Sequence, residues 1–283
     1  MTAAEPSGPL QSYVDKWLAV QPRQRIALAF VDGARYPGHI ALAALEQELL
    51  SAAYGIREPQ VAAVKLNWWA EELSGAAASG GRHPLTQVLF DDERAQRVPA
   101  ERWLAPVLAG MAQLEEGTAA DFEAQVAAAS LLHGAIAELE TTWWFGNGAF
   151  SARAGRVATL SHLLFSLLRL EEDAERDRLA LPMARLARHG LSRNGLRMAS
   201  PAREDAVRAQ LDDLHAAWRE ADRLPGPLSA FRGLESRHGR ALVAKARKAA
   251  DPLAVLRQGQ GRQGPAVVWQ AWQAARAWRK QVG

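Results

Sequence analysis

The sequence predicts an all-α fold in a single domain of about ten helices. Alanine, leucine, arginine and glutamate dominate the chain, and these residues are strong helix formers. Alternating β-branched residues, which would indicate strands, are scarce. No repeat of solenoid length recurs and no Gly/Ser-rich linker divides the chain, so the pattern favours one domain.

Glycine- and proline-containing breaks set the order and bounds of the expected helices, because both residues disfavour a helix interior. From the amino end, we expect helices near residues 10–20, 38–55, 59–78, 100–115, 119–145, 153–177, 182–190, 203–224, 227–250 and 265–281. The breaks are Tyr36-Pro37-Gly38, Glu58-Pro59, Gly80-Gly81, Gly146-Asn147-Gly148, His189-Gly190, Leu224-Pro225-Gly226-Pro227 and Gly259 to Gly264. Within 203–224, apolar residues recur in steps of three and four, which predicts an amphipathic helix with the seam Val207, Leu211, Leu214, Trp218 and Ala221.

Composition excludes several classes of protein. The 283-residue chain is 48% hydrophobic and 23% charged, the balance of a soluble globular protein. It has no cysteine, which excludes disulfides, thiolate metal sites and a cysteine nucleophile. Met1 to Gln21 lacks the pattern of a secretory signal, and the best apolar stretch, 157–168, is too short to cross a bilayer. We therefore expect a cytoplasmic protein.

The net charge of +3 hides an uneven distribution. Residues 230–283 carry eleven Lys or Arg against Glu235 and Asp251, whereas residues 1–229 carry 23 bases and 29 acids. Such a basic tail suits a phosphorylated ligand or an anionic membrane surface, or it is simply a solvated basic helix. We expect no nucleic-acid partner, because no nucleic-acid-binding motif accompanies the charge.

The expected helix 265–281 combines aromatic and basic side chains, namely Trp269, Trp272, Trp278, Arg276, Arg279 and Lys280. Two interpretations stay open. Either this helix packs against the domain, or it is an amphipathic basic helix that makes the protein peripheral to anionic membranes.

The expected helix 153–177 carries a polar stripe. At about 100° per residue, one face takes up His162, Ser166, Arg169, Asp173 and Asp177. Asp173 and Asp177 lie four residues apart, and paired carboxylates at this spacing can hold Mg²⁺. The alternative is an acidic face in contact with water, the usual way in which a soluble helix meets solvent.

The expected helix 38–55 has only two acidic residues, Glu46 and Glu48, which a separation of two positions directs to opposite sides. Glu48 shares its side with the small residues Ala41, Ala44, Ser51, Ala52 and Gly55. This stripe predicts either the close approach of another helix or a cavity wall that holds one carboxylate.

Two blocks of sequence resemble the squalene/phytoene synthase family. The first runs from Tyr54-Gly55-Ile56-Arg57-Glu58-Pro59 through Lys65-Leu66-Asn67-Trp68-Trp69 to Gly80-Gly81-Arg82-His83-Pro84-Leu85. The second runs from Leu167-Leu168-Arg169 through Arg178-Leu179-Ala180-Leu181-Pro182 to His189-Gly190-Leu191. Their order and gaps agree with the family over roughly Arg25 to Leu191.

This resemblance implies an isoprenoid synthase-like helical domain over residues 25–283, built around a central cavity, with residues 1–24 as an N-terminal extension or first helix. In active members, aspartates on two facing helices bind Mg²⁺, which holds the diphosphates of the prenyl donors. Carried onto this chain, the candidate catalytic residues are Glu48, Asp173 and Asp177, with Asp173 and Asp177 as metal ligands. The candidate diphosphate-binding residues are Lys65, Arg169 and Arg178, and the candidate cavity-lining residues are His162, Ser166 and Glu172.

The sequence departs from the family pattern at the acidic motifs. The first motif cannot form a carboxylate pair three or four residues apart. In the second, the position of an expected aspartate is taken by Arg169 or, if one deletion is allowed, by Leu170. A cation there opposes a metal ion by Coulomb repulsion. We therefore expect impaired or lost condensation, in a divergent branch similar to relatives of a complex I assembly factor.

Two functions stay open at this point. One is a protein that binds a prenyl or other anionic ligand, or that acts in assembly with an unidentified protein partner, without a cofactor. The other is an active prenyl transferase that uses Mg²⁺ with the altered carboxylate set Glu48, Glu172, Asp173 and Asp177 on farnesyl or geranylgeranyl diphosphate. The seven histidines have no metal-ligand spacing on one helix, so a zinc or di-iron site is not expected.

Overall fold

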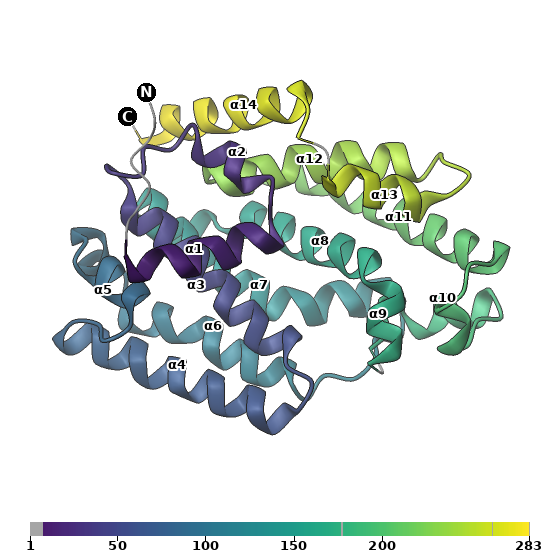
Figure 1. The fold of residues 1–283 in the computed structure, drawn as a ribbon, viewed down its shortest axis with the longest axis horizontal. Coiled ribbons are helices and arrows are strands. Elements are labelled where there is room, and N and C mark those ends of the chain that lie inside the picture. Colours follow the sequence, from purple (N-terminus) through teal and green to yellow (C-terminus); the bar gives the residue numbers. More distant parts are fainter. Residues whose placement is uncertain (1–7, 177, 262, 283) are drawn as a thin grey trace.

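A computed structural model describes residues 8–176, 178–261 and 263–282. Over these residues the chain forms helices and no strand, which confirms the all-α fold (Figure 1). The N-terminal half contains α1 (Pro9–Val20), α2 (Gln24–Leu28), α3 (Pro37–Leu50), α4 (Pro59–Ser79), α5 (Pro84–Phe90), α6 (Ala100–Gln113) and α7 (Phe122–Phe145). The C-terminal half contains α8 (Ala152–Leu168), α9 (Leu170–Glu175), α10 (Met183–Arg188), α11 (Pro201–Ala221), α12 (Ala230–Ala246), α13 (Pro252–Gly261) and α14 (Pro265–Val282).

Two large apolar clusters form the core, one at each side of the molecule. The first joins α1, α3, α4, α5 and α6 with the last turns of α7 and with α14. The second joins α8 to α11 and α13 with the first turns of α7. Helices α7 and α12 contribute side chains to both clusters, and α7 packs along α8 through the middle of the molecule (Figure 1). The long helices α7 and α12 therefore hold the two halves together.

Local sequence signals explain many of the helix ends. Proline occupies the first turn of α1, α3, α4, α5 and α11, where its missing N–H is not needed. Asp121 caps α7 by accepting a hydrogen bond of 2.8 Å from the backbone N–H of Ala124, and Ser200 caps α11 in the same way. Gly146 ends α7 in the left-handed conformation, with φ of 73°.

Three helices were not predicted from the sequence. Helices α2 and α5 are only 5 and 7 residues long, too short for an apolar period to be visible. Helix α13 includes Gly259, which its neighbouring glycines had indicated as part of a break. Instead, Gly259 lets α13 approach α12, because a side chain at this position would collide with Leu242.

The expected helix 153–177 is divided into two. Arg169 leaves the helical conformation, with φ of −101° and ψ of 10°, and separates α8 from α9. Its backbone N–H bonds to Ser166 O at 3.2 Å, which is the tighter i→i+3 pattern. The chain therefore changes direction at Arg169, and Asp173 belongs to a different helix from His162.

The expected helix 38–55 also changes character near its end. After α3, residues Ser51–Gly55 form one turn of π-helix, which we label η1. Such turns widen a helix locally and often occur at functional sites.

Among the described residues, no helix combines the length and the apolar character required to span a membrane.

Candidate functional site: a cavity between the two halves

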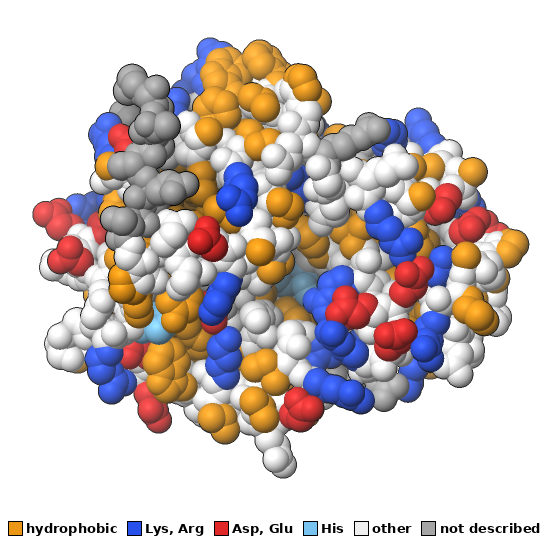
Figure 2. Space-filling view, in the orientation of Figure 1, with side chains coloured by type: hydrophobic (Ala, Val, Ile, Leu, Met, Phe, Trp, Pro, Cys, Tyr) orange, Lys and Arg blue, Asp and Glu red, His pale blue; other side chains and the backbone are white. Residues whose placement is uncertain are grey.

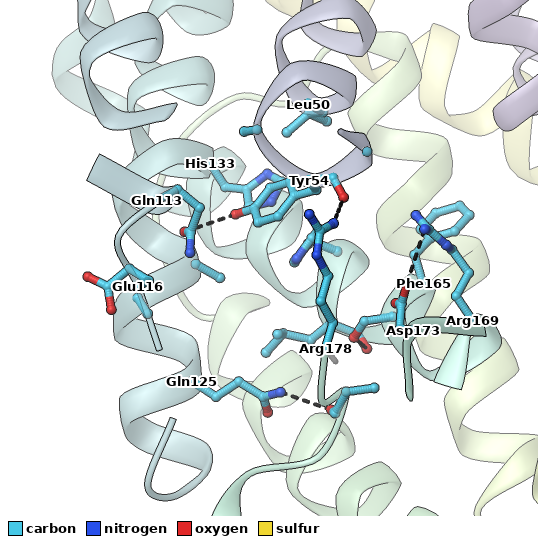
Figure 3. A pocket seen from close by; sticks show the side chains of 18 of the residues that line it. Leu50, Tyr54, Gln113, Glu116, Gln125, His133, Phe165, Arg169, Asp173 and Arg178 are labelled. Carbon is cyan, nitrogen blue, oxygen red and sulfur yellow. Dashed lines mark hydrogen bonds and ion pairs between the residues drawn. The ribbon is translucent and has the colours of Figure 1, made fainter. Parts of the chain in front are cut away.

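A cavity of about 700 Å³ lies between the two halves of the molecule. Its walls come from the end of α3 and η1, the middle of α7, the polar face of α8, and α9 with the segment that follows it (Figure 3). The apolar lining includes Leu50, Ala53, Ile56, Leu163, Phe165 and Leu181. The volume falls within the range of small-molecule sites, about 300–1,000 Å³.

Arg169 and Asp173 form an ion pair in the α8–α9 wall. The Arg169 Nη2 and Asp173 Oδ1 atoms are 3.1 Å apart, and both residues line the cavity with His162 and Ser166 (Figure 3). Burial raises the pKa of Asp173, although Arg169 and Arg178 act in the opposite direction. The described members of the predicted polar stripe thus do face the cavity. Asp177, the remaining member, lies outside the described residues.

Glu172, which was predicted to line the cavity, does not line it. It is exposed and lies 2.7 Å from Arg176 Nη2, and it is not part of the cavity lining. An ion pair of this kind at the surface contributes little to stability.

A buried cluster of charges occupies the α3 side of the cavity. The Arg232 guanidinium donates to both carboxylate oxygens of Glu46 at 2.9 Å, to Glu140 at 3.0 Å and to Glu235 at 2.8 Å. Arg232, Glu46 and Glu235 line the cavity. Burial, together with the neighbouring Glu140 and Glu235, raises the pKa of Glu46 to about 7 in spite of Arg232.

Arg232 belongs to the core and not to the basic tail in which its sequence position places it. Its side chain is only 4% exposed, so its charge balances buried carboxylates rather than contributing to the surface. Sequence reasoning missed it because one arginine in a basic helix gives no sign that it faces inward.

Arg178, a predicted diphosphate-binding residue, has a guanidinium that binds backbone carbonyl groups. Its guanidinium donates to the carbonyl oxygens of Tyr54 and Ile56, the latter at 2.7 Å (Figure 3). These carbonyls stand at the end of η1, where a helix leaves acceptors without partners. Arg178 therefore fastens the segment after α9 to the end of α3 across one wall of the cavity.

Three aromatic rings meet inside the cavity. The Tyr54 and His162 ring centroids are 4.2 Å apart, and those of His133 and His162 are 4.7 Å apart. Burial lowers the pKa of His162 to about 4 and holds the pKa of His133 well below its ordinary value, so both imidazoles are neutral at pH 7. Neither nitrogen of His133 has a hydrogen-bond partner among the described residues. The sequence prediction did not include His133, although a histidine within the apolar helix α7 was the available signal.

Besides Glu172, two more of the predicted site residues, Glu48 and Lys65, lie away from the cavity. Lys65 Nζ is 2.9 Å from Glu48 Oε2, Lys16 Nζ is 3.8 Å from Glu48 Oε1, and neither Glu48 nor Lys65 lines the cavity. As predicted, Glu46 and Glu48 point in different directions, but Glu46 is the one that faces the cavity. The small residues Ala41, Ala44 and Ala52 on the Glu48 side are buried in close helix packing.

The carboxylates of the described residues do not suit a magnesium ion. No group of three or more His, Asp or Glu side chains is arranged to hold a metal in this part of the chain. The two cavity carboxylates nearest to that role, Glu46 and Asp173, each pair with an arginine. Mg²⁺ requires several oxygen ligands in near-octahedral geometry, and a guanidinium repels it.

A family model and two solved structures all relate this chain to squalene and phytoene synthases. The model of the family described as "Squalene/phytoene synthase" matches residues 25–273. A crystal structure of a dehydrosqualene synthase in complex with ligand aligns with a TM-score of 0.67 and 11% identity, over 96% of this chain and 99% of that one. Squalene synthase HpnC from Alicyclobacillus acidocaldarius aligns with a TM-score of 0.64 and 18% identity, over 88% of this chain and 95% of that one. Among curated proteins, none matches the sequence.

Proposed function

This chain belongs to the squalene/phytoene synthase family, and we propose that its cavity binds a prenyl ligand with an anionic end, without magnesium-dependent head-to-head condensation. The proposal is carried by one observation. The carboxylates in two walls of the cavity, the partly buried Glu46 and the buried Asp173, are each neutralised by an arginine, Arg232 and Arg169. An arginine already occupies the position beside each carboxylate where a divalent ion would have to bind.

Basic side chains in the cavity lining support binding of an anionic group. Arg57, Arg169, Arg176 and Arg178 all line the cavity. Arginine presents a planar fork of donors that suits phosphate oxygens. Arg57 and Arg176 are exposed, so they can turn towards a ligand without breaking a buried contact.

Apolar side chains on the remaining walls support a hydrocarbon chain as the rest of the ligand. Burial of apolar ligand surface against such walls is favourable by about 25 cal/mol per Å². A purely structural assembly protein has no need of a hollow of this size. The cavity therefore favours ligand binding over assembly as the role of this fold.

Calorimetry with farnesyl diphosphate tests the proposal. We expect the same dissociation constant in magnesium buffer and in EDTA. Incubation with Mg²⁺ and farnesyl or geranylgeranyl diphosphate should yield no squalene or phytoene by mass spectrometry. Binding that occurs only with magnesium, or formation of either hydrocarbon, would contradict the proposal.

Variants of the cavity arginines locate the anionic end. Because a hydrogen bond to a charged group contributes about 1.5–3 kcal/mol, Arg57→Gln or Arg176→Gln should weaken farnesyl diphosphate binding by about tenfold or more. Arg188→Gln, which changes an exposed arginine outside the cavity, is the matched control and should leave the affinity unchanged. If all three variants bind equally well, the anion lies elsewhere.

The alternative is an active prenyl transferase with an altered carboxylate set. It is favoured by the fact that Glu46 of α3 and Asp173 of α9 approach the same cavity from different helices. Asp173→Asn separates the two functions. It should abolish magnesium-dependent turnover if the alternative holds, whereas metal-independent binding should persist, because the neutral amide would release Arg169 for the ligand anion.

A further inference from the structure

The outer face of α14 is divided along its length into an apolar half and a basic half. Val268 and Trp269 are exposed, at 43% and 57%, and Trp272 is half-buried beside them. The rings of Trp269 and Trp272 stack, with centroids 4.7 Å apart. Arg276, Arg279 and Lys280 are exposed in the last turns. Figure 2 shows this division, with apolar side chains over α14 at the top of the view and basic ones towards its end.

The inner face of the same helix is fully packed. Val267, Ala271, Ala274, Ala275 and Trp278 are buried in the first apolar cluster. Trp278, which the sequence had grouped with the other two tryptophans, is therefore a core residue. The outward tryptophans add nothing to that core, so their exposure needs a different explanation, since large exposed apolar patches commonly mark interaction sites.

The net charge around this face is positive. Residues 252–283 contain five Lys or Arg and no acidic residue. Helix α14 packs against α2, and Arg279 donates to Phe30 O in the adjoining segment. That segment, residues 21–36, adds three arginines and one aspartate. A partner for this face must therefore present negative charge next to apolar material.

We propose that the outer face of α14 is a docking surface for a membrane that contains anionic lipids. Indole rings reside favourably at the boundary between headgroups and acyl chains, and exposed bases are attracted to anionic headgroups. Trp269 and Trp272 enter this boundary, while Arg276 and Lys280 remain at headgroup level. The Arg276 guanidinium lies 5.3 Å from the Trp272 ring centre, which keeps the two groups side by side.

Vesicle flotation with the full chain tests this surface. We expect wild-type protein to float with phosphatidylcholine–phosphatidylglycerol vesicles at low salt, and to float poorly at high salt or with phosphatidylcholine alone. Trp269→Gln with Trp272→Gln should reduce partitioning by about tenfold or more, because it removes the apolar contact. Arg276→Gln with Lys280→Gln should reduce it about 30-fold, since each base near the surface contributes about a factor of five.

The controls use residues that keep the fold intact. Deletion of α14 is unsuitable, because it would remove Trp278 from the core. Val64→Gln changes an even more exposed apolar residue on α4 and should leave flotation unchanged. Equal binding to neutral vesicles, or no flotation, would overturn the proposal. A dimer in sedimentation that the Trp269→Gln variant dissociates would overturn it too, because the face would then belong to a second copy.

Discussion

The Arg232 guanidinium donates to both carboxylate oxygens of Glu46 at 2.9 Å, across 186 positions of sequence. This contact joins α12 to α3 at the wall of the cavity and keeps Glu46 from acting as an unpaired anion. It therefore shapes the cavity as well as the fold.

Removal of Arg232 should be strongly destabilising. Arg232→Met leaves Glu46, Glu140 and Glu235 without their shared cation, and breaking a buried pair in this way costs about 3–5 kcal/mol. Urea unfolding at pH 7 measures the change. The difference in the free energy of unfolding between Arg232→Met and wild type should shrink as pH falls, because the carboxyls can then take up protons. Arg240→Met, which removes an exposed ion pair with Asp222, is the control and should cost less than about 1 kcal/mol.

Glu72 should make stability depend on acid pH. Burial alone would raise its pKa, but hydrogen bonds from the Thr86 hydroxyl and from the backbone N–H groups of His83 and Arg82 lower the pKa of Glu72 to about 2. A carboxyl whose pKa is lower in the folded state stabilises the protein above its ordinary pKa of 4.5, and this stabilisation is lost as pH falls towards 2.

The matched pair Glu72→Gln and Glu71→Gln tests this pH dependence. At pH 7, Glu72→Gln should reduce the free energy of unfolding by about 1–3 kcal/mol, because donors that faced a carboxylate now face an amide. The difference from wild type should narrow below pH 4.5. Glu71 is exposed, so its variant should behave like wild type. A constant difference from pH 7 to pH 3 would contradict the assignment.

Arg178 should control the order of the η1 turn. Arg178→Ala removes two charged donors from the carbonyls of Tyr54 and Ile56. This should lower the free energy of unfolding by about 2 kcal/mol. Hydrogen exchange of backbone amides in residues 51–58 should accelerate more than exchange in α4. Arg176→Ala removes only an exposed ion pair and should leave the exchange pattern unchanged.

Two glycines in helices should respond to alanine with opposite signs. A Cβ at Gly239 would lie 2.8 Å from the Trp218 ring, so Gly239→Ala should destabilise by about 1–3 kcal/mol. A Cβ at Gly75 would meet nothing within 4 Å, so Gly75→Ala should stabilise α4 by about 0.5–1 kcal/mol. Thermal unfolding of both variants shows whether each alanine raises or lowers the stability.

Much of the fold follows from short-range pattern. The predicted seam of α11, from Val207 to Trp218, is buried in the second cluster. An apolar stripe at helical spacing lies on one face of the helix, and packing that face against the core removes it from water. The family assignment likewise followed from blocks of sequence rather than from composition.

The site was less predictable, because it depends on contacts between distant segments. The direction in which Arg232 and His133 face is decided by tertiary packing. No local pattern distinguishes Arg232 from a surface residue, and for His133 the local signal was the apolar character of α7. The departure of Arg169 from the helix is equally invisible to propensity, since arginine is a good helix former. Sequence alone correctly separated Glu46 from Glu48, but it did not show that Arg232 of α12 pairs with Glu46 at the cavity wall.

The place of α14 in the first cluster has a consequence for biosynthesis. Trp278 packs against Tyr36 and Trp144, with ring centroids 5.2 Å and 4.9 Å away, so residues from early, middle and late in translation share one aromatic contact. While the ribosome is still making α14, the earlier aromatics remain uncovered. Contacts between such distant segments form slowly, so this aromatic contact is completed only after α14 has been made.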